Sequence, residues 1–338
     1  MVDLSGAIQQ MVMLFVVAIV GYVAAKLGYL DMETKNKLTR LLLNITLPCM
    51  IVASVDGLSL EEAGSLVPWA FALSAAQFFL LLACGVLCCA LLRVPAHQRR
   101  EYVFMCLCTN TGFIGIPVVA ALYGTESVLF SSIFVMVISA FFYSIGLMVI
   151  APQTDGSDAA GASTDAAAGA EAGAKKGSRG IVAALRAVPW RSIVNPCMVG
   201  CLVALALFFA QVELPDLVVD TLDMIGGITS PVALMLVGVI MANVDLKSVV
   251  GELRLYPFIL IRQLVVPAVL YFVLMAIVPS ELLVGVFTIM FSMPVGSMAS
   301  LFVEMNGGDS ELVAKGTILS TAGSFACIPA LVAIMTML

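Results

Sequence analysis

Charge is what this chain has least of. Only 11% of its 338 residues are Asp, Glu, Lys or Arg, whereas 62% are hydrophobic. A typical soluble domain carries about 25% charged residues, because its surface faces water. The shortage of charge therefore excludes a soluble globular domain and predicts an integral membrane protein.

Other scarce residue types exclude several enzyme classes. His97 is the only histidine and lies between apolar runs, so no serine–histidine site is built within a span. Asp occurs only in loops and at span ends, which excludes an intramembrane aspartyl protease. There is no phosphate-cradling Gly-Lys-Ser/Thr loop, and the nine cysteines lie in apolar runs as small hydrophobic side chains. We predict no enzyme, no cofactor and no metal.

Long apolar runs are what the chain has instead. A run of about 20 apolar residues is enough to cross a bilayer as a helix. The sequence predicts ten spans, near residues 8–26, 38–55, 66–92, 102–123, 127–150, 192–211, 224–243, 255–277, 282–304 and 312–336.

Basic residues are absent from one side of the predicted membrane protein. Fourteen of the 16 lysines and arginines follow spans 1, 3, 5 and 7, whereas the opposite loops collect acidic residues. By the positive-inside rule, both termini lie outside and the central loop is cytoplasmic. An odd number of spans per half makes the two halves antiparallel.

The chain divides into two halves around a segment of low complexity. Residues 151–190 are rich in Ala and Gly and predict a flexible cytoplasmic linker. It separates a first unit, residues 1–150, from a second, residues 191–338. A shift of 183 residues superposes the spans and places Ile45-Thr46-Leu47-Pro48 on Ile228-Thr229-Ser230-Pro231. Together with the opposite orientation, this predicts an inverted repeat.

Two spans are interrupted, one in each half. Thr109-Asn110-Thr111-Gly112-Phe113-Ile114-Gly115-Ile116-Pro117 breaks span 4, and Ser292-Met293-Pro294-Val295-Gly296-Ser297 breaks span 9. Asn, Gly and Pro admit non-helical backbone, which hydrocarbon tolerates only where protein or a water-filled cavity satisfies the freed groups. The 183-residue shift brings the two breaks together. Paired broken spans indicate a secondary transporter with its site near the midplane.

These motifs carry a resemblance to a known family. Asn44-Ile45-Thr46-Leu47-Pro48, the span 4 motif, Asn195-Pro196, Met293-Pro294-Val295-Gly296 and Gly307-Gly308-Asp309 resemble the auxin efflux carrier family, which includes bacterial malate and malonate permeases. The similarity covers the whole chain except the linker.

The resemblance implies an all-α fold similar to sodium/proton antiporters and bile-acid symporters. In that fold, spans 1, 2, 6 and 7 form a scaffold, and spans 3–5 and 8–10 form a bundle that moves against it. Spans 4 and 9 cross near the membrane centre. The family also implies transport of small organic anions, a homodimer packed through the scaffold, and a plasma membrane location, which is the inner membrane in a bacterium.

The strongest candidates for binding substrate lie at the two breaks. Asn110 offers two donors and an acceptor from an unwound position, although it is also able simply to cap freed backbone groups. The other candidates at the breaks are Thr111, Gly112, Pro294 and Gly296. Pro294 marks the second crossover, whereas Pro117 is a kink or hinge.

Further candidates come from the spans around the breaks. Asn44, Thr46, Thr229 and Ser230 form polar kinks with Pro48 and Pro231, and either contact substrate or support the kinks. Arg262 lies inside span 8, where it either pairs with a carboxylate or snorkels to the headgroups. Glu304 and Gln77 are weaker candidates for ion coupling.

The sequence thus predicts a secondary transporter that carries a small mono- or dicarboxylate by elevator-type alternating access. The crossing offers neutral dipoles rather than carboxylates, which favours an anion over a cation. A sodium- or proton-coupled cation transporter of the same fold stays open as the alternative, as does a receptor or scaffold. Export on the membrane potential and uptake with a proton or sodium ion are both open.

Overall fold

The computed structural model describes residues 4–150, 196–212, 214–243, 251–296 and 298–336. The predicted linker, residues 151–190, lies outside the described residues, as do Asn195 and Ser297. The described residues form helices joined by short loops, which confirms the prediction of an all-α protein. Among the described residues, five helical stretches are long and apolar enough to cross a membrane: Leu66–Leu91, Glu126–Tyr143, Asp216–Ala242, Leu255–Met275 and Ser310–Thr336.

The helices of the first half follow the predicted spans closely. Their bounds are α1 (Leu4–Lys26), α2 (Met32–Leu41), a π-helical turn (Leu42–Thr46), α3 (Leu47–Ala53), α4 (Leu60–Ala63), α5 (Leu66–Leu91), a 3-10 turn (Ala96–Gln98), α6 (Arg99–Leu107), a second π-helical turn (Thr111–Gly115), α7 (Ile116–Tyr123), α8 (Glu126–Ser144) and a 3-10 turn (Gly146–Val149).

The second half has the same general order. Its helices are α11 (Pro196–Ala210), α12 (Asp216–Gly227), α13 (Thr229–Ala242), α15 (Leu255–Leu260), a third π-helical turn (Ile261–Val265), α16 (Val266–Met275), α17 (Glu281–Ser292), α18 (Ala299–Met305) and α19 (Ser310–Thr336). Predicted spans 4 and 9 are each built from two helices, α6 with α7 and α17 with α18.

The three π-helical turns have one local cause. Each ends two residues before a proline, namely Pro48, Pro117 and Pro267. Proline has no N–H, and its ring crowds the carbonyl four residues earlier, so the preceding turn widens. Because a π turn adds a residue to the helix, it also rotates the side chains that follow onto a different face.

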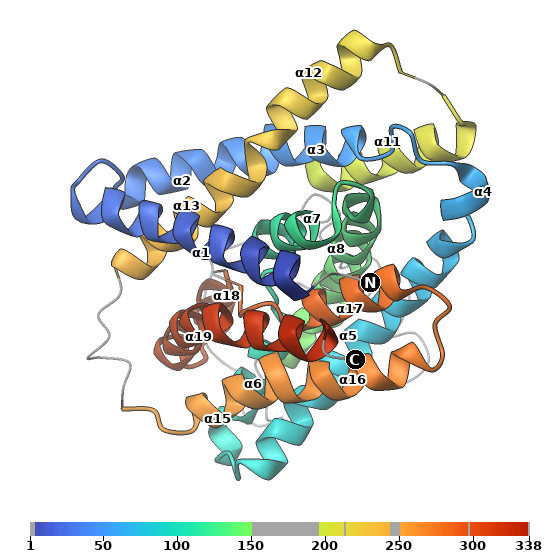
Figure 1. Cartoon of the computed structure of the whole chain (residues 1–338). Helices are drawn as coiled ribbons and strands as arrows, with labels where there is room; N and C mark the ends of the chain where they lie inside the picture. Colours follow the sequence, from blue (N-terminus) through green and yellow to red (C-terminus); the bar gives the residue numbers. More distant parts are fainter. Residues whose placement is uncertain (1–3, 151–195, 213, 244–250, 297, 337–338) are drawn as a thin grey trace, which may run out of the picture.

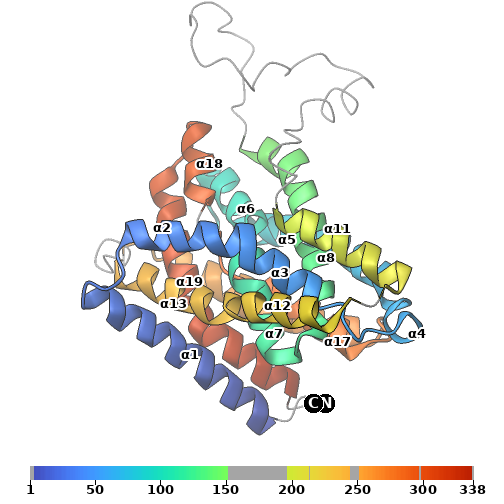
Figure 2. The ribbon, with the colours of Figure 1, turned by 90° about the horizontal axis from the view of Figure 1, so that it is seen from above.

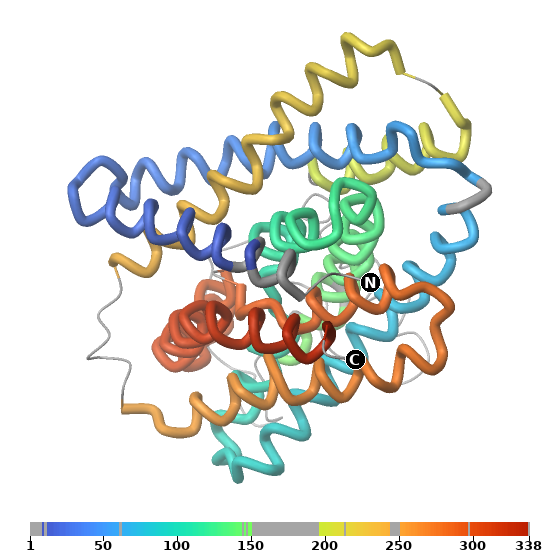
Figure 3. Tube along the Cα trace, viewed as in Figure 1, coloured from blue at the N-terminus to red at the C-terminus, as the bar shows by residue number. Residues whose placement is uncertain are grey.

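The helices gather into two groups (Figure 1). Helices α2, α3, α11, α12 and α13 lie toward one edge, whereas α5, α6 and α15 to α19 lie toward the other, and α7 and α8 lie between them. Figure 2 shows α1 beside α19, an arrangement that includes an edge-to-face contact of Phe15 and Phe325. The continuous trace of α12 and α13 crosses the continuous trace of α2 and α3 (Figure 3), and the two pairs of helices are in contact.

Glycines allow helices α1 and α13 to pack in close contact. A Cβ atom added to Gly238 would collide with the backbone oxygen of Ala18 and lie 2.6 Å from the nitrogen of Tyr22. A Cβ added to Gly21 would collide with the backbone of Met235 in the same way. Small residues at such positions let helix backbones touch in membranes, so van der Waals packing holds the pair together.

Candidate functional site

The two interrupted helices meet at their breaks. The N–H of Asn110 donates to the carbonyl of Pro294 at 2.8 Å. The N–H of Gly296 donates to the carbonyl of Cys108 at 2.7 Å, and Thr109 and Val295 form an antiparallel bridge. Two unwound segments from opposite halves of the chain therefore satisfy each other's backbone groups, as burial in an apolar protein requires.

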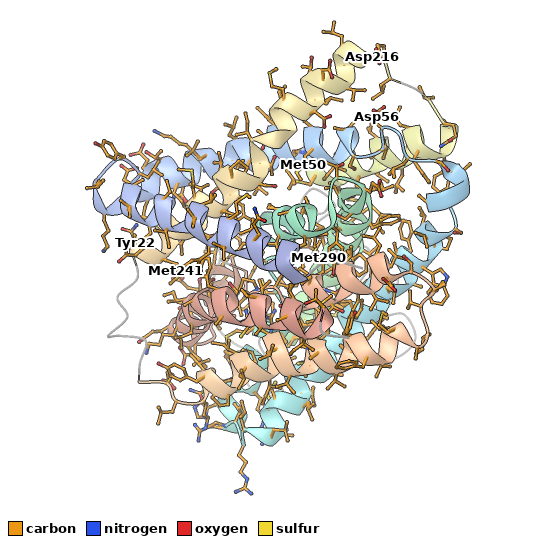
Figure 4. All side chains as sticks on the ribbon, viewed as in Figure 1. Tyr22, Met50, Asp56, Asp216, Met241 and Met290 are labelled. Atoms are coloured by element: carbon orange, nitrogen blue, oxygen red, sulfur yellow. The ribbon has the colours of Figure 1, made fainter. Side chains whose placement is uncertain are left out.

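The residue types at the breaks explain this pairing. Proline lacks an N–H, so Pro294 contributes only its carbonyl. Gly296 has no side chain, and a Cβ there would lie 3.3 Å from the Cys108 sulfur. A Cβ on Gly115 would lie 2.7 Å from the sulfur of Met290, which Figure 4 labels on α17. Glycine at both positions lets the two broken helices approach closely.

Two further side chains hold the second break. The hydroxyl of Ser320, on α19, accepts from the N–H of Val295 at 3.0 Å. The Nη1 of Arg262 donates to the carbonyl of Met293 at 2.6 Å, at the C-terminal end of α17. A cation at a helix C-terminus also interacts favourably with the helix dipole.

A cavity of about 450 Å³ lies on one side of the crossing. Its walls come from α2, the end of α6, the first break with the π-helical turn that follows it, the C-terminal half of α8, the end of α13, and the second break with α18. The lining includes Lys35, Asn36, Thr39, Arg40, Thr109, Asn110, Thr111, Gly112, Phe113, Ser139, Phe142, Tyr143, Gly296 and Phe302. The volume is in the range of pockets that bind small molecules.

Asn110 stands out among the lining residues. Its backbone is fully used, because its carbonyl accepts from Ile114 at 3.3 Å and from Gly115 at 3.2 Å. Its half-buried side-chain amide has no hydrogen-bond partner among the described residues. The neighbouring Thr109 hydroxyl is buried and also lacks a partner there. The half-buried Asn110 amide is therefore available to a ligand in the cavity, whereas the Thr109 hydroxyl lies beneath its surface.

Two basic residues, Lys35 and Arg40, also line the cavity. In the sequence they served only to predict the orientation in the membrane. Lys35 and Arg40 lie one and a half turns apart on α2. Neither has a carboxylate within salt-bridge distance in the part of the chain described, whereas their neighbour Lys37 pairs with Glu33 at 2.7 Å. Lys35 precedes the predicted span 38–55, and partial burial lowers its pKa. Two unpaired cations give the cavity a positive potential that attracts anions.

Aromatic rings form the remaining wall. Phe142 and Tyr143 on α8 pack against Phe302 on α18 with ring centroids 5.7 and 6.3 Å apart. Phe113 completes the apolar lining beside the first break. The cavity thus combines an apolar wall with two cations and an amide, which suits a small anion with a carbon skeleton.

The kink residues predicted as ligands fall outside the cavity lining. Asn44 is exposed and its amide donates to the carbonyl of Arg40 at 2.7 Å. Thr46 and Thr229 are buried and contact each other, with 2.9 Å between their hydroxyl oxygens. Ser230 is half-buried, and Pro231 is exposed in the first turn of α13. Pro48 packs against Gly200 of α11.

The remaining predicted residues also lie away from the cavity. Arg262 is fully buried, which excludes snorkelling, and it contacts the second break from the side that does not line the cavity. Gln77 is fully buried with no partner for its amide among the described residues. The predicted coupling role of Glu304 depended on burial, but Glu304 lies on the exposed face of α18.

Paired broken helices beside a polar cavity, within an apolar helical protein, define a membrane transport protein. The chain matches the membrane transport protein family over residues 7–332, and it belongs to this family, the auxin efflux carrier family. The match confirms the predicted resemblance and the prediction that the protein is a transporter and not an enzyme. No curated protein matches the chain.

Proposed function

We propose that the protein is a secondary transporter that carries a small organic anion, a mono- or dicarboxylate, by elevator-type alternating access. The substrate carboxylate binds the Asn110 amide at the crossing, with Thr109, Thr111, Gly112 and Gly296 around it. Pro294 shapes this site without touching the substrate, because it keeps the second break open and accepts the Asn110 N–H.

The observation that carries this proposal is the charge of the cavity. Lys35 and Arg40 lie in its wall without carboxylate partners among the described residues, and no Asp or Glu lines it. A cation would meet an unfavourable potential there, whereas an anion is attracted. This favours a carboxylate over the sodium- or proton-coupled cation transporter that the sequence leaves open as the alternative.

An inverted repeat accounts for the pairing of helices from the two halves. Helix α1 packs on α13, and α11 packs on α3 in the corresponding way. The hydroxyl groups of Thr46 and Thr229, which the 183-residue shift superposes, contact each other. A contact between equivalent residues is what a pseudo-two-fold axis produces. In this scheme residues 1–150 and 191–338 are the two repeats, and the kinks at Pro48 and Pro231 support the crossing from the scaffold.

The charged residues support one orientation. Asp56 and Asp216 lie toward the same edge in Figure 4, while Tyr22 and Met241 lie toward the opposite edge. When the edge that carries Asp56 and Asp216 faces the outside, both termini are also outside, the linker is cytoplasmic and the cavity faces the cytoplasm. Helices α1 to α3 and α11 to α13 then form the scaffold and the dimer contact, and the other helices carry the substrate.

The proposal is tested by flux into and out of proteoliposomes that contain the full chain. We expect saturable flux of at least one of radiolabelled pyruvate, lactate, malate, malonate and succinate, and no flux of choline, a cation of similar size. Sodium gradient, pH and membrane potential are varied one at a time to identify the driving force. Absence of saturable carboxylate flux under every condition would overturn the proposal.

The same assay tests the two cavity cations. Changing Lys35→Gln and Arg40→Gln together should raise KM about tenfold at low salt, because two favourable charge interactions are lost. The difference should shrink in high salt, which screens charges near water. Lys37→Gln is the matched control, because Lys37 lies between them in sequence but pairs with Glu33 and does not line the cavity. Equal effects of Lys37→Gln and the double change would contradict a role for the cavity charge.

A further inference from the structure

Arg262 is a buried cation that the proposed binding site does not use. Its side chain is 0% exposed. Only Nη1 has a partner, the carbonyl of Met293, whereas Nε and Nη2 have none among the described residues. Arg does not lose its proton in proteins, so a full positive charge is buried here. A charge held at this depth without a counter-ion is costly and marks a function.

No acidic side chain of the described residues neutralises Arg262. The described ion pairs join Lys37 to Glu33, Arg100 to Glu101, and Lys315 to Glu311. Glu101 is the buried carboxylate, and Arg100 already balances it at 3.0 Å, at the start of α6. Among the described residues, Arg262 is therefore the buried charge without a carboxylate partner in the group of helices proposed to move.

The position of Arg262 ties its charge to the crossing. Its guanidinium bonds the carbonyl of Met293, and the next residue, Pro294, accepts the N–H of Asn110. The cation thus contacts the second break one residue before the pairing of Pro294 with Asn110, on the side away from the cavity. It acts on a bound carboxylate through a low-dielectric interior without touching it.

We infer that Arg262 is the fixed counter-charge of the transported anion: the bundle moves with one positive charge when empty and with no net charge when it holds a monocarboxylate. This rests on the proposed function. It means that the membrane potential acts on the return of the empty carrier rather than on the loaded step. An inside-negative potential then draws the empty carrier to the cytoplasmic-facing state, ready to load for export.

Charge movement in the absence of substrate tests this inference without knowledge of the substrate. Voltage steps are applied to membranes that contain the full chain in carboxylate-free solution. We expect a transient current that saturates at up to one elementary charge per carrier. A charge that crosses the whole field changes its equilibrium about 50-fold per 100 mV. Saturating monocarboxylate should suppress the transient, because the loaded bundle is neutral.

Variants assign the transient to Arg262. Arg262→Met should abolish it in the empty carrier and create one in the presence of a monocarboxylate, whereas Arg262→Lys should keep the original pattern. Arg93→Gln is the control, because it removes the same charge from the exposed residue that follows α5. A merely structural role would change the amount of protein or the rate, but not the sign of the substrate effect.

The outcomes separate the two proposals. No transient in the wild type, or a transient unchanged in Arg262→Met, would overturn the counter-charge even if carboxylates are transported. A transient that depends on Arg262 supports it even if every carboxylate in the flux panel fails, which would overturn only the proposed substrate class. If Arg262→Met does not fold, the wild type and Arg262→Lys still decide, because both must show the transient.

Discussion

Changing Asn110→Ala should lower kcat/KM for the transported carboxylate by about 10- to 100-fold, because a hydrogen bond to a charged group contributes about 1.5–3 kcal/mol. The Asn110 backbone pairs with Pro294 through its N–H, which alanine retains, so the crossing itself should persist. The measurement is initial flux into proteoliposomes at several substrate concentrations, normalised to the amount of folded protein.

Asn243→Ala is the matched control for this change. Asn243 is exposed at the C-terminal end of α13, and its side-chain amide donates a hydrogen bond to the carbonyl of Val239 at 2.8 Å. It does not line the cavity. Transport by Asn243→Ala should stay within about twofold of the wild type, since exposed substitutions of this kind have small effects. Transport by Asn110→Ala at the same level would place the substrate elsewhere.

Changing Gly238→Ala should have the largest effect on stability. The added methyl group would collide with the Ala18 carbonyl and the Tyr22 nitrogen, which are backbone atoms and are not able to rotate away. Helices α1 and α13 would have to separate along their whole contact. Overpacking of this kind costs about 1–3 kcal/mol, and backbone contacts place this site at the upper end. The measurement is the midpoint of thermal unfolding in detergent, together with the yield of monodisperse protein.

Gly227→Ala separates this packing effect from the general effect of replacing glycine in a helix. Gly227 ends α12, and a Cβ there would meet nothing within 4 Å. Alanine has the higher helix propensity, so the variant should be as stable as the wild type or slightly more so. If Gly238→Ala unfolds at the same temperature as Gly227→Ala, the close contact of α1 and α13 does not hold the fold together.

The sequence was sufficient to locate the two breaks and to predict that they coincide. Asn110, Pro294 and Gly296 are residue types that interrupt helices, and an apolar background makes such interruptions conspicuous. Freed backbone groups in an apolar environment must find partners, and the resemblance to the family predicted that the two breaks meet near the membrane centre. The structure adds the partners themselves, Asn110 with Pro294 and Cys108 with Gly296.

The cavity wall was harder to predict because it depends on tertiary arrangement. The segment that contains Lys35 and Arg40 has the composition of an ordinary cytoplasmic loop. Only the packing of α2 over the crossing places these two residues in the cavity wall. Asn44 was predicted either to contact substrate or to support a kink, and it lies within the π-helical turn Leu42–Thr46, where its amide donates to the Arg40 carbonyl, outside the cavity lining. The sequence placed Arg262 inside an apolar span, and the structure shows that its side chain is buried in the protein, but the sequence did not show which way the side chain points.

A cryo-electron microscopy map of the full chain in lipid nanodiscs, with a transported carboxylate present, tests the central claim most directly. We expect α6–α7 and α17–α18 to be interrupted and paired at Asn110 and Pro294, with density for the anion between the Asn110 amide and α2. Continuous helices at either break, or an anion bound away from the crossing, would contradict the account.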